Sequence, residues 1–211
     1  MTYDELVQQV KDYLETDETT FNANIDTFIK LAEEDIRSKV QLPAFRERDT
    51  ATFTASNQYL TVPTGFLAAY EMSVSVSGTE TTLLRKDVSF LKEAYPTSTT
   101  GTPKYYSLLD ENTFVVAPTP LSGYTVTLDY FRAPDSLTAG AGSGTTWLSE
   151  NAEQALLWGT VVQAYIFLKG GADLLQVYTT AYGNAIDSLS GLGEGLKKKD
   201  SYRHGERRVP A

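Results

Sequence analysis

Residues 101–120 read GTPKYYSLLDENTFVVAPTP, and residues 124–134 follow after a short turn as YTVTLDYFRAP. Apolar and polar residues alternate along these runs with the two-residue period of strands that bury one face. The polar turn Asp110-Glu111-Asn112 separates the first two runs, and Asp and Asn favour tight turns because their side chains bond to the nearby backbone. The stretch therefore predicts a three-stranded β-meander.

The same period extends upstream of this segment. Tyr70 to Val76 gives the cleanest alternation in the chain, and residues 81–85 are expected to return antiparallel after the Ser77-Gly78 turn. Only residues 87–95 interrupt the pattern, with the spacing of a short helix. We expect a small antiparallel β-sheet or sandwich module over residues 46–137.

The beginning of the chain shows helical spacing instead. Apolar residues recur every three or four positions over residues 3–14 and again over residues 20–40. Thr2 and Glu5 have the spacing of a capping box, which favours a helix that starts between them. Residues 1–45 are therefore expected to supply two amphipathic helices.

The later part of the chain predicts two more helices. One is expected to begin at Ser149 as N-cap and is apolar nearly all round, which is typical of a central helix. The other is expected to end at the glycines of residues 191–195. These patterns predict an α+β fold: a four-helix bundle from residues 1–45 and 146–195, an inserted β module, and an extended tail over residues 196–211.

Net charge divides the chain into an acidic body and a basic tail. The whole chain carries −9, whereas residues 197–211 hold six basic and two acidic residues and carry +4, which leaves −13 for the rest. An acidic body opposes sequence-independent DNA binding, which needs clustered Lys and Arg. The tail lacks apolar periodicity and is expected to be disordered in the free protein.

Several classes of protein chemistry lack the residues they need. The chain has no cysteine and one histidine, His204, so thiol nucleophiles, serine–histidine triads and the usual zinc sites are not expected. No phosphate-binding loop motif occurs, and the longest apolar run, residues 156–168, is too short to span a bilayer. The N-terminal residues do not form an apolar signal sequence. We expect no enzyme, no cofactor, no bound metal and no membrane contact.

The residue motifs of the central strands point to a particular protein family. A G-x-P-x-Y-Y strand, an F-x-x-x-P-x-P strand and a Y-x-V-x-L-x-Y strand precede a Trp-led apolar helix. Together with FIKLAEEDI followed by VQLP, and with WLSENAEQALL at residues 147–157, this order resembles the head-to-tail adaptor (connector) proteins of tailed bacteriophages. These are also called tail tubular protein A in short-tailed phages. The resemblance covers nearly the whole chain.

The resemblance implies a structural role in the virion neck. In that family about twelve copies form a ring below the portal, continue its DNA channel and present a platform for the tail nozzle or tube. DNA would pass through the channel during ejection without specific binding. Assembly would take place in the host cytoplasm.

Two sets of contact residues are expected by the same reasoning. The basic tail is expected to reach the portal, because its charge suits an acidic surface and it can order on docking; the residues are Lys197, Lys198, Lys199, Tyr202, Arg203, Arg207 and Arg208. DNA in the channel is the alternative partner of this tail. Two loops at the ends of the β module are expected to meet the tail of the virion: Ser77, Gly78 and Thr79, and Asp110, Glu111 and Asn112.

Two other classes of function remain open from the residues alone. Tyrosines concentrate on the central strands at Tyr105, Tyr106, Tyr124 and Tyr130. Such rings stack on sugars as well as filling cores, so a carbohydrate-binding or host-recognition module is an alternative. A glycosidase needs only paired carboxylates; the candidates are Asp110 with Glu111, and Glu33, Glu34 and Asp35. Turn formation and an exposed helix face explain these carboxylates more simply.

Overall fold

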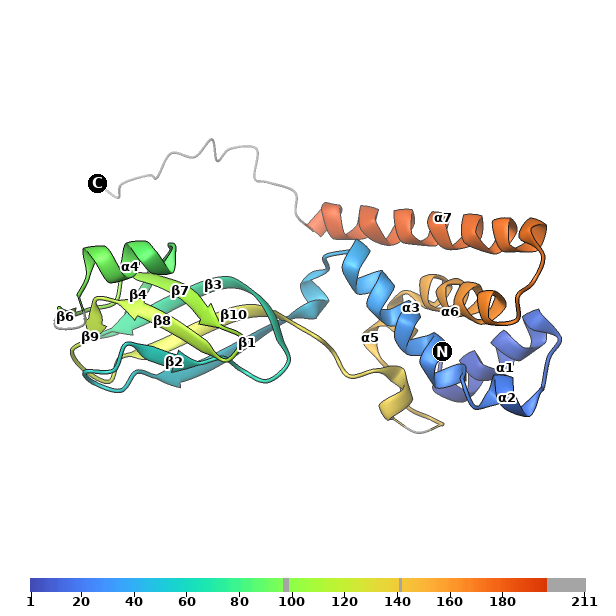
Figure 1. The fold of residues 1–211 in the computed structure, drawn as a ribbon, viewed down its shortest axis with the longest axis horizontal. Helices are drawn as coiled ribbons and strands as arrows, with labels where there is room; N and C mark the ends of the chain where they lie inside the picture. The colour runs from blue at the N-terminus through green and yellow to red at the C-terminus, as the bar shows by residue number, and fades with distance from the viewer. Residues whose placement is uncertain (97–98, 141, 197–211) are drawn as a thin grey trace. The chain divides into compact units, whose positions relative to one another are not determined.

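The computed structural model describes residues 1–96, 99–140 and 142–196. These residues form a mixed α and β fold, as the sequence patterns predict (Figure 1). Two compact units are present, a helical unit made of residues 1–44 and the chain from 135 onward, and a β unit of residues 45–134.

The helical unit is organised around one apolar helix, α6 (Glu153–Phe167). It contacts α1 (Tyr3–Leu14), α3 (Ile25–Lys39), α5 (Trp147–Asn151) and α7 (Ala172–Leu196) (Figure 1). Leu156 and Val161 of α6 are fully buried. The lack of a polar face on this helix therefore corresponds to a central position. The short α2 (Thr19–Asn22) and two 3₁₀ turns, Pro43–Phe45 and Leu137–Ala139, lie between these helices and the β unit or within the helical segments.

Capping follows the sequence at the first helix. The Thr2 hydroxyl accepts from the Glu5 amide and the Glu5 carboxylate accepts from the Thr2 amide, which confirms the predicted capping box. The amides of Tyr3 and Asp4, which have no partner inside the helix, donate to the carbonyls of Gly144 and Gly142. The glycine-rich connector is thus tied to the N-terminus of α1.

The predicted helix over residues 20–40 is wrong as a single element. It breaks between α2 and α3 at residues 23–24. The Asn24 side chain donates to the Thr20 carbonyl and the Asn22 side chain donates to Asp17. Asn side chains that bond the local backbone compete with the helical ladder, and a break results.

Two further helix boundaries differ from prediction. Thr146 is the N-cap that precedes α5, with Ser149 at the third helical position of a capping box, and α6 starts after Ala152. The last helix continues through residues 191–195 to Leu196. Glycine costs about 1 kcal/mol per helical residue relative to alanine but does not forbid a helix.

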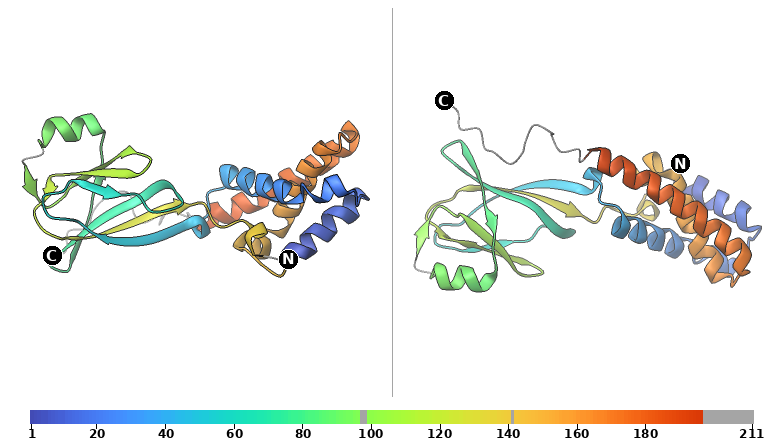
Figure 2. Two further views of the ribbon diagram at one scale, coloured as in Figure 1. Left: turned by 60° about the horizontal axis from the view of Figure 1, so that its bottom comes forward. Right: turned by 90° about the horizontal axis from the view of Figure 1, so that it is seen from above.

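The β unit is a sandwich of two four-stranded sheets (Figure 2). The first, sheet A, has the order β1-β10-β3-β4 and is antiparallel throughout; its strands are Arg46–Thr52, Thr125–Arg132, Phe66–Val76 and Thr79–Thr82. The second, sheet B, has the order β2-β8-β7-β5, with strands Tyr59–Thr61, Thr113–Ala117, Tyr105–Asp110 and Leu84–Arg85, and its β5–β7 pair is parallel. A small parallel pair joins β6 (Thr100–Gly101) and β9 (Thr119–Pro120).

The predicted three-stranded meander is therefore wrong in its third strand. β7 and β8 form the expected hairpin, but β10 belongs to the opposite sheet, between β1 and β3. Pro118 and Pro120 follow β8, and proline cannot donate to a strand ladder. The chain leaves sheet B there and crosses to sheet A.

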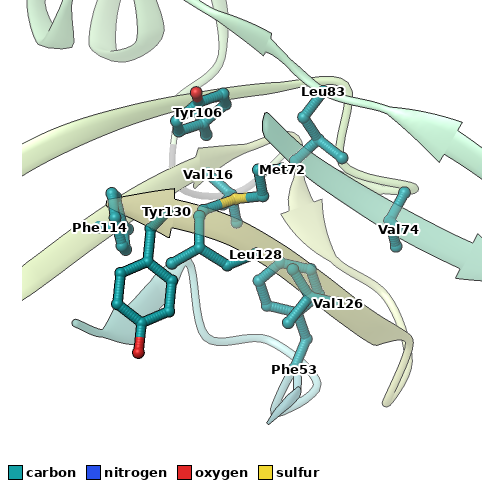
Figure 3. Close-up of a cluster of buried hydrophobic side chains, with 10 residues drawn as sticks. All are labelled: Phe53, Met72, Val74, Leu83, Tyr106, Phe114, Val116, Val126, Leu128 and Tyr130. Carbon is teal, nitrogen blue, oxygen red and sulfur yellow. The ribbon is translucent and has the colours of Figure 1, made fainter. Parts of the chain in front are cut away.

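The sandwich core lies between the two sheets. Ten side chains fill it, from both sheets and the adjoining loops (Figure 3): Phe53, Met72, Val74, Leu83, Tyr106, Phe114, Val116, Val126, Leu128 and Tyr130. On the outer side of sheet B, α4 (Val88–Ala94) covers Val115 and Ala117 with Leu91. β8 is thus buried on both faces, which explains its continuous apolar sequence.

Candidate interaction surfaces

The carboxylates considered for catalysis on α3 have structural partners. Glu33 is 6% exposed, and its carboxylate accepts from the Leu137 amide at 2.9 Å. The expectation that this group lies on an exposed helix face is therefore wrong for Glu33. Asp35 accepts from the Tyr182 hydroxyl at 2.6 Å and from Lys39 at 2.6 Å. These contacts join α3 to α7 and to the segment after the β unit.

Electrostatics agree with this structural role. Burial raises the pKa of Asp35, but the hydrogen bonds from Lys39 and Tyr182 outweigh it, so that the pKa lies below the ordinary aspartate value. Burial, and then the bond to Asp35, raise the pKa of Tyr182. Both groups therefore keep their ordinary ionisation at neutral pH, with the phenol donating to the carboxylate.

An open groove of about 490 Å³ contains a second pair of carboxylates, Glu47 and Asp49, on edge strand β1. Glu47 lies 3.3 Å from Arg132 and accepts from the Tyr130 hydroxyl at 3.2 Å. The groove is open and this carboxylate is held by neighbours. In the described part of the chain, no cluster of three metal-binding side chains occurs.

The tyrosines that suggested sugar binding are partly core residues. Tyr106 and Tyr130 are buried, and their rings belong to the sandwich core (Figure 3). Tyr105 packs under α4 against Phe90 and Tyr95. These three rings are held by protein neighbours.

The loop at Ser77–Thr79 is a two-residue hairpin turn. Ser77 and Gly78 both have positive φ, 51° and 81°, which is the pattern of a type I′ turn. The turn joins β3 to β4, whose last pair is Val76 with Thr79. Its side chains are exposed, apart from the half-buried Val76 that precedes it.

The second loop, Asp110–Asn112, is held by its own side chains. The Asp110 carboxylate accepts from the Asn112 amide at 2.8 Å, and the Asn112 carbonyl accepts from the Val62 amide at 2.9 Å. The three residues are exposed. The turn chemistry predicted from Asp and Asn is thus present.

The structure does not bring these two loops together. The chain enters the β unit next to Arg46 and leaves it after Arg132, and Phe66 pairs with Arg132 at that end. Val62, the partner of Asn112, lies just before Phe66, so the Asp110 loop belongs to this end. The Ser77 turn lies beyond the opposite end of the ladder, where Ser75 pairs with Thr125. The two loops therefore occupy opposite ends of the β unit.

The two ends of the β unit differ in the charge of their side chains. The entry end carries Arg46, Glu47, Asp110, Glu111 and Arg132. The end with the Ser77 turn is formed by residues 52–57, 77–79 and 119–124, which hold no charged side chain and many hydroxyls. Leu121 is exposed there. Of the two ends, the one with the Ser77 turn is the uncharged surface.

Sequence patterns missed one cluster on the outer face of sheet A. Arg46 of β1 lies over the Tyr70 ring, 3.9 Å from its centroid, and 5.4 Å from that of Phe131. Tyr70 was expected to alternate inward with Met72, but it is 54% exposed, and Leu67, on the same strand, is 58% exposed. We call Arg46, Leu67, Tyr70 and Phe131 the Arg46 cluster.

Sequence alone gives little signal for this cluster. The bulges that turn Tyr70 and Leu67 outward occur opposite β10 and interrupt the two-residue period. Strand alternation assumes unbroken pairing, so it places Tyr70 on the wrong face.

The outer face of α7 is the second exposed surface of note. Leu174 and Val177 are 52% and 60% exposed, one helical turn apart. No charged residue occurs from Leu174 to Ile186, and Asp173 precedes them. Tyr178, one helical turn after Leu174, packs its ring inward against Trp158 and Tyr165.

The expected portal contacts, Lys197 to Arg208, lie outside the described residues. Among the described helices, none is both long and apolar enough to cross a membrane. The Met1 ammonium nitrogen lies 2.6 Å from the Glu153 carboxylate, which ties the start of α1 to the start of α6.

Comparison with known families assigns the whole chain. The family described as SU10 adaptor protein matches residues 1–209. No curated protein matches the sequence.

Proposed function

Because the chain belongs to the SU10 adaptor protein family, we propose that it is a structural subunit of a bacteriophage neck. Its copies form a ring that joins the portal vertex to the tail and continues the DNA channel. The observation that carries this proposal is the family match, which spans residues 1–209 and therefore both units. It agrees with the resemblance to phage head-to-tail adaptors in the central strands and the helices.

The helical unit suits the body of such a ring. We propose that α1, α3, α6 and α7 act as one four-helix frame, since α6 contacts each of the other three. The hydrogen bond from Tyr182 to Asp35 and that from Tyr3 to Asp26 link pairs of these helices from outside the apolar centre. A frame fixed in this way keeps its shape while about twelve copies associate.

The charge of the body suits a DNA channel. Residues 1–196 carry a net charge of −13. An acidic wall repels the phosphate backbone, so DNA can pass without adhering. The chain would then line the path of DNA during ejection without binding any sequence.

The basic tail supplies the portal contact in this proposal. Residues 197–211 carry +4 and are the one strongly basic segment. Charge complementarity with an acidic portal surface favours rapid and specific encounter. A chain that ends after Leu196, the last residue of α7, should form no stable portal complex. Full portal binding by this truncated chain would show that the basic tail does not make the portal contact.

Tail-side contacts are proposed for the two β-unit loops, and their separation makes the proposal testable. Replacing Ser77 and Thr79 by lysine changes only the uncharged end, whereas replacing Asp110 and Glu111 by lysine changes only the entry end. If one loop contacts the phage tail, its replacement should block attachment of the phage tail and preserve portal binding. Unchanged tail attachment in both variants would place the contact elsewhere.

Co-sedimentation with the purified portal ring of the same phage tests the function as a whole. The full chain should move with the portal through a density gradient at low salt, and less of it should do so as salt rises, since the proposed contact is ionic. A chain that stays at the top of the gradient at every salt concentration contradicts the adaptor role. A glycan-binding assay of that chain is then the next experiment.

A further inference from the structure

Two β-bulges shape the outer face of sheet A. Along the β3–β10 ladder, Tyr130 pairs with Ala69 and Asp129 pairs with Glu71, so Tyr70 has no partner. A second shift leaves Leu67 unpaired between Phe66 and Ala68. A bulge gives one strand an extra residue and redirects its side chain. Both extra residues here are large, apolar and more than half exposed.

Arg46 makes this exposed pair a composite site. Its guanidinium stacks on the Tyr70 ring at 3.9 Å, and the Tyr70 and Phe131 rings meet edge to face at 6.2 Å. The Arg46 Nε is covered and has no hydrogen-bond partner, and Arg46 forms no ion pair with any described carboxylate. The rings hold the cation in place. The hydrogen bond from Arg48 lowers the pKa of Asp129 most, and the charge of Arg46 lowers it further without forming an ion pair, so the Arg46 guanidinium can still bind a carboxylate from outside.

The composition of the Arg46 cluster is that of a protein-binding centre. Tyr and Arg are enriched among residues that dominate interface energies, and they act best where a carboxylate or apolar group completes the contact. The exposed parts of Leu67 and Tyr70 give the isolated chain no hydrophobic stabilisation, because they stay in water. Burial by a partner would recover that surface.

A matching surface exists on the same chain. The outer face of α7 presents Leu174 and Val177 next to Asp173, the only charged residue of α7 before Asp187. Asp173 forms no ion pair within the described residues. One surface thus offers a fixed cation with apolar side chains, and the other offers a carboxylate with apolar side chains.

A ring needs two different complementary surfaces on each copy. Head-to-tail contacts close a ring when one patch of a subunit meets another patch of its neighbour, whereas identical patches give two-fold dimers. The Arg46 cluster lies in the β unit and the Asp173 face lies in the helical unit, so each copy carries two different patches, as a head-to-tail contact requires.

We propose that the Arg46 cluster of one copy binds the Asp173–Val177 face of α7 of the next copy. The occupant of the Arg46 cluster is therefore a second copy of this chain. Leu67 and Tyr70 pack against Leu174 and Val177, and Arg46 pairs with Asp173. This inference rests on the proposed ring and names the surfaces that build it.

Cross-linking of engineered cysteines tests this contact directly, since the chain has no cysteine of its own. Leu67→Cys is prepared unlabelled and Val177→Cys is prepared with ¹⁵N, and the two are mixed with the portal ring and a short bismaleimide. The expected product is the mixed dimer, identified by mass. Leu31→Cys, an exposed leucine on α3, replaces Val177→Cys as the matched control and should give little product.

Charge reversal gives a second readout. Recovery of the cross-linking yield in a double variant distinguishes a lost ion pair from a folding defect. Arg46→Glu and Asp173→Lys should each lower the cross-linking yield severalfold, and the double variant should recover most of it, because the pair is restored with opposite sign. Failure of the double variant to exceed either single variant would overturn the pairing. Circular dichroism of each variant shows whether the fold is kept.

The outcomes separate this contact from the proposed function. Portal-bound rings that give no mixed product above the Leu31→Cys control overturn the Arg46–α7 contact and leave the adaptor role intact. A product dominated by Leu67–Leu67 dimers also overturns it, in favour of a two-fold contact. If no variant associates with the portal, the proposed ring and this contact fail together.

Discussion

The helical unit and the β unit differ in the contacts that join their elements in the interior. In the helical unit, polar groups reach between elements: Tyr182 donates to Asp35, and the buried Glu33 accepts from the Leu137 amide. In the β unit, ion pairs such as Arg48 with Asp129 lie on the outside, and the ten-residue core is apolar apart from its tyrosine hydroxyls. Side-chain hydrogen bonds thus join helices to one another, whereas packed apolar side chains fill the space between the two sheets.

Truncation of a core side chain in either unit should give the largest loss of stability. Leu156→Ala and Met72→Ala each remove a fully buried side chain, from α6 and β3 respectively, and each should lower the free energy of unfolding by about 2–5 kcal/mol. Hydrogen exchange by mass spectrometry should show lost protection only in the substituted unit. Equal loss in both units from either substitution would contradict the division into two units.

The buried carboxylate of the helical unit gives the next effect. Glu33→Ala leaves the Leu137 amide without its acceptor, and should cost about 1–3 kcal/mol in a denaturant titration. Glu33→Gln keeps an acceptor and should cost less. Glu34→Ala, at the exposed neighbour, should stay within about 0.5 kcal/mol of the parent protein. Equal costs for Glu33→Ala and Glu34→Ala would mean that the bond contributes nothing.

Replacement of glycine by alanine should change the free energy of unfolding in opposite directions in the two units. Gly78→Ala in the β unit faces open space, but its φ of 81° is a left-handed conformation that costs alanine about 1–2 kcal/mol. Gly183→Ala in α7 also faces open space and lies within a helix, so it should stabilise by about 0.5–1 kcal/mol. Thermal unfolding distinguishes them. Destabilisation by both would show that the surroundings of Gly183 are more restricted than its geometry indicates.

Alkaline pH should also lower stability, and the two tyrosines with large pKa shifts, Tyr3 and Tyr182, lie in the helical unit. Burial and then the hydrogen bond to Asp26 raise the pKa of Tyr3 from 10.0 to about 12, and burial with Asp35 raises the pKa of Tyr182. The unfolded chain releases these protons near pH 10 while the folded chain keeps them, so stability is complete below pH 10 and falls between about pH 10 and 12.

Removing the bonded hydroxyl should reduce this alkaline loss. Tyr182→Phe should lose less stability between pH 9 and pH 11 than the parent protein, measured by urea titration at each pH. Tyr59→Phe, whose ring is exposed, should behave like the parent. An identical pH dependence for Tyr182→Phe would show that the bond to Asp35 does not persist in solution.

Sequence patterns predicted the fold best where one local rule acts alone. The capping box at Thr2 and Glu5, the β7–β8 hairpin and the central apolar helix each depend on a short window of residues. The break at residues 23–24 has a local cause, but two other errors arose where neighbours in space override the local pattern. β10 pairs with strands far away in sequence, and α7 continues through its glycines.

The candidate surfaces show the same division. The turns at Ser77 and Asp110 were predicted because their residues determine turn geometry locally. That they lie at opposite ends depends on strand direction in two different sheets. The Arg46 cluster was missed because a bulge, which reverses the side on which Tyr70 points, leaves no mark in strand alternation.

Native mass spectrometry of the chain with the portal ring of its phage tests the adaptor role most directly. The expected product is a portal complex that carries a ring of about twelve added copies, which is a closed assembly of identical subunits. A portal that gains no copies at micromolar concentration and low salt would contradict it.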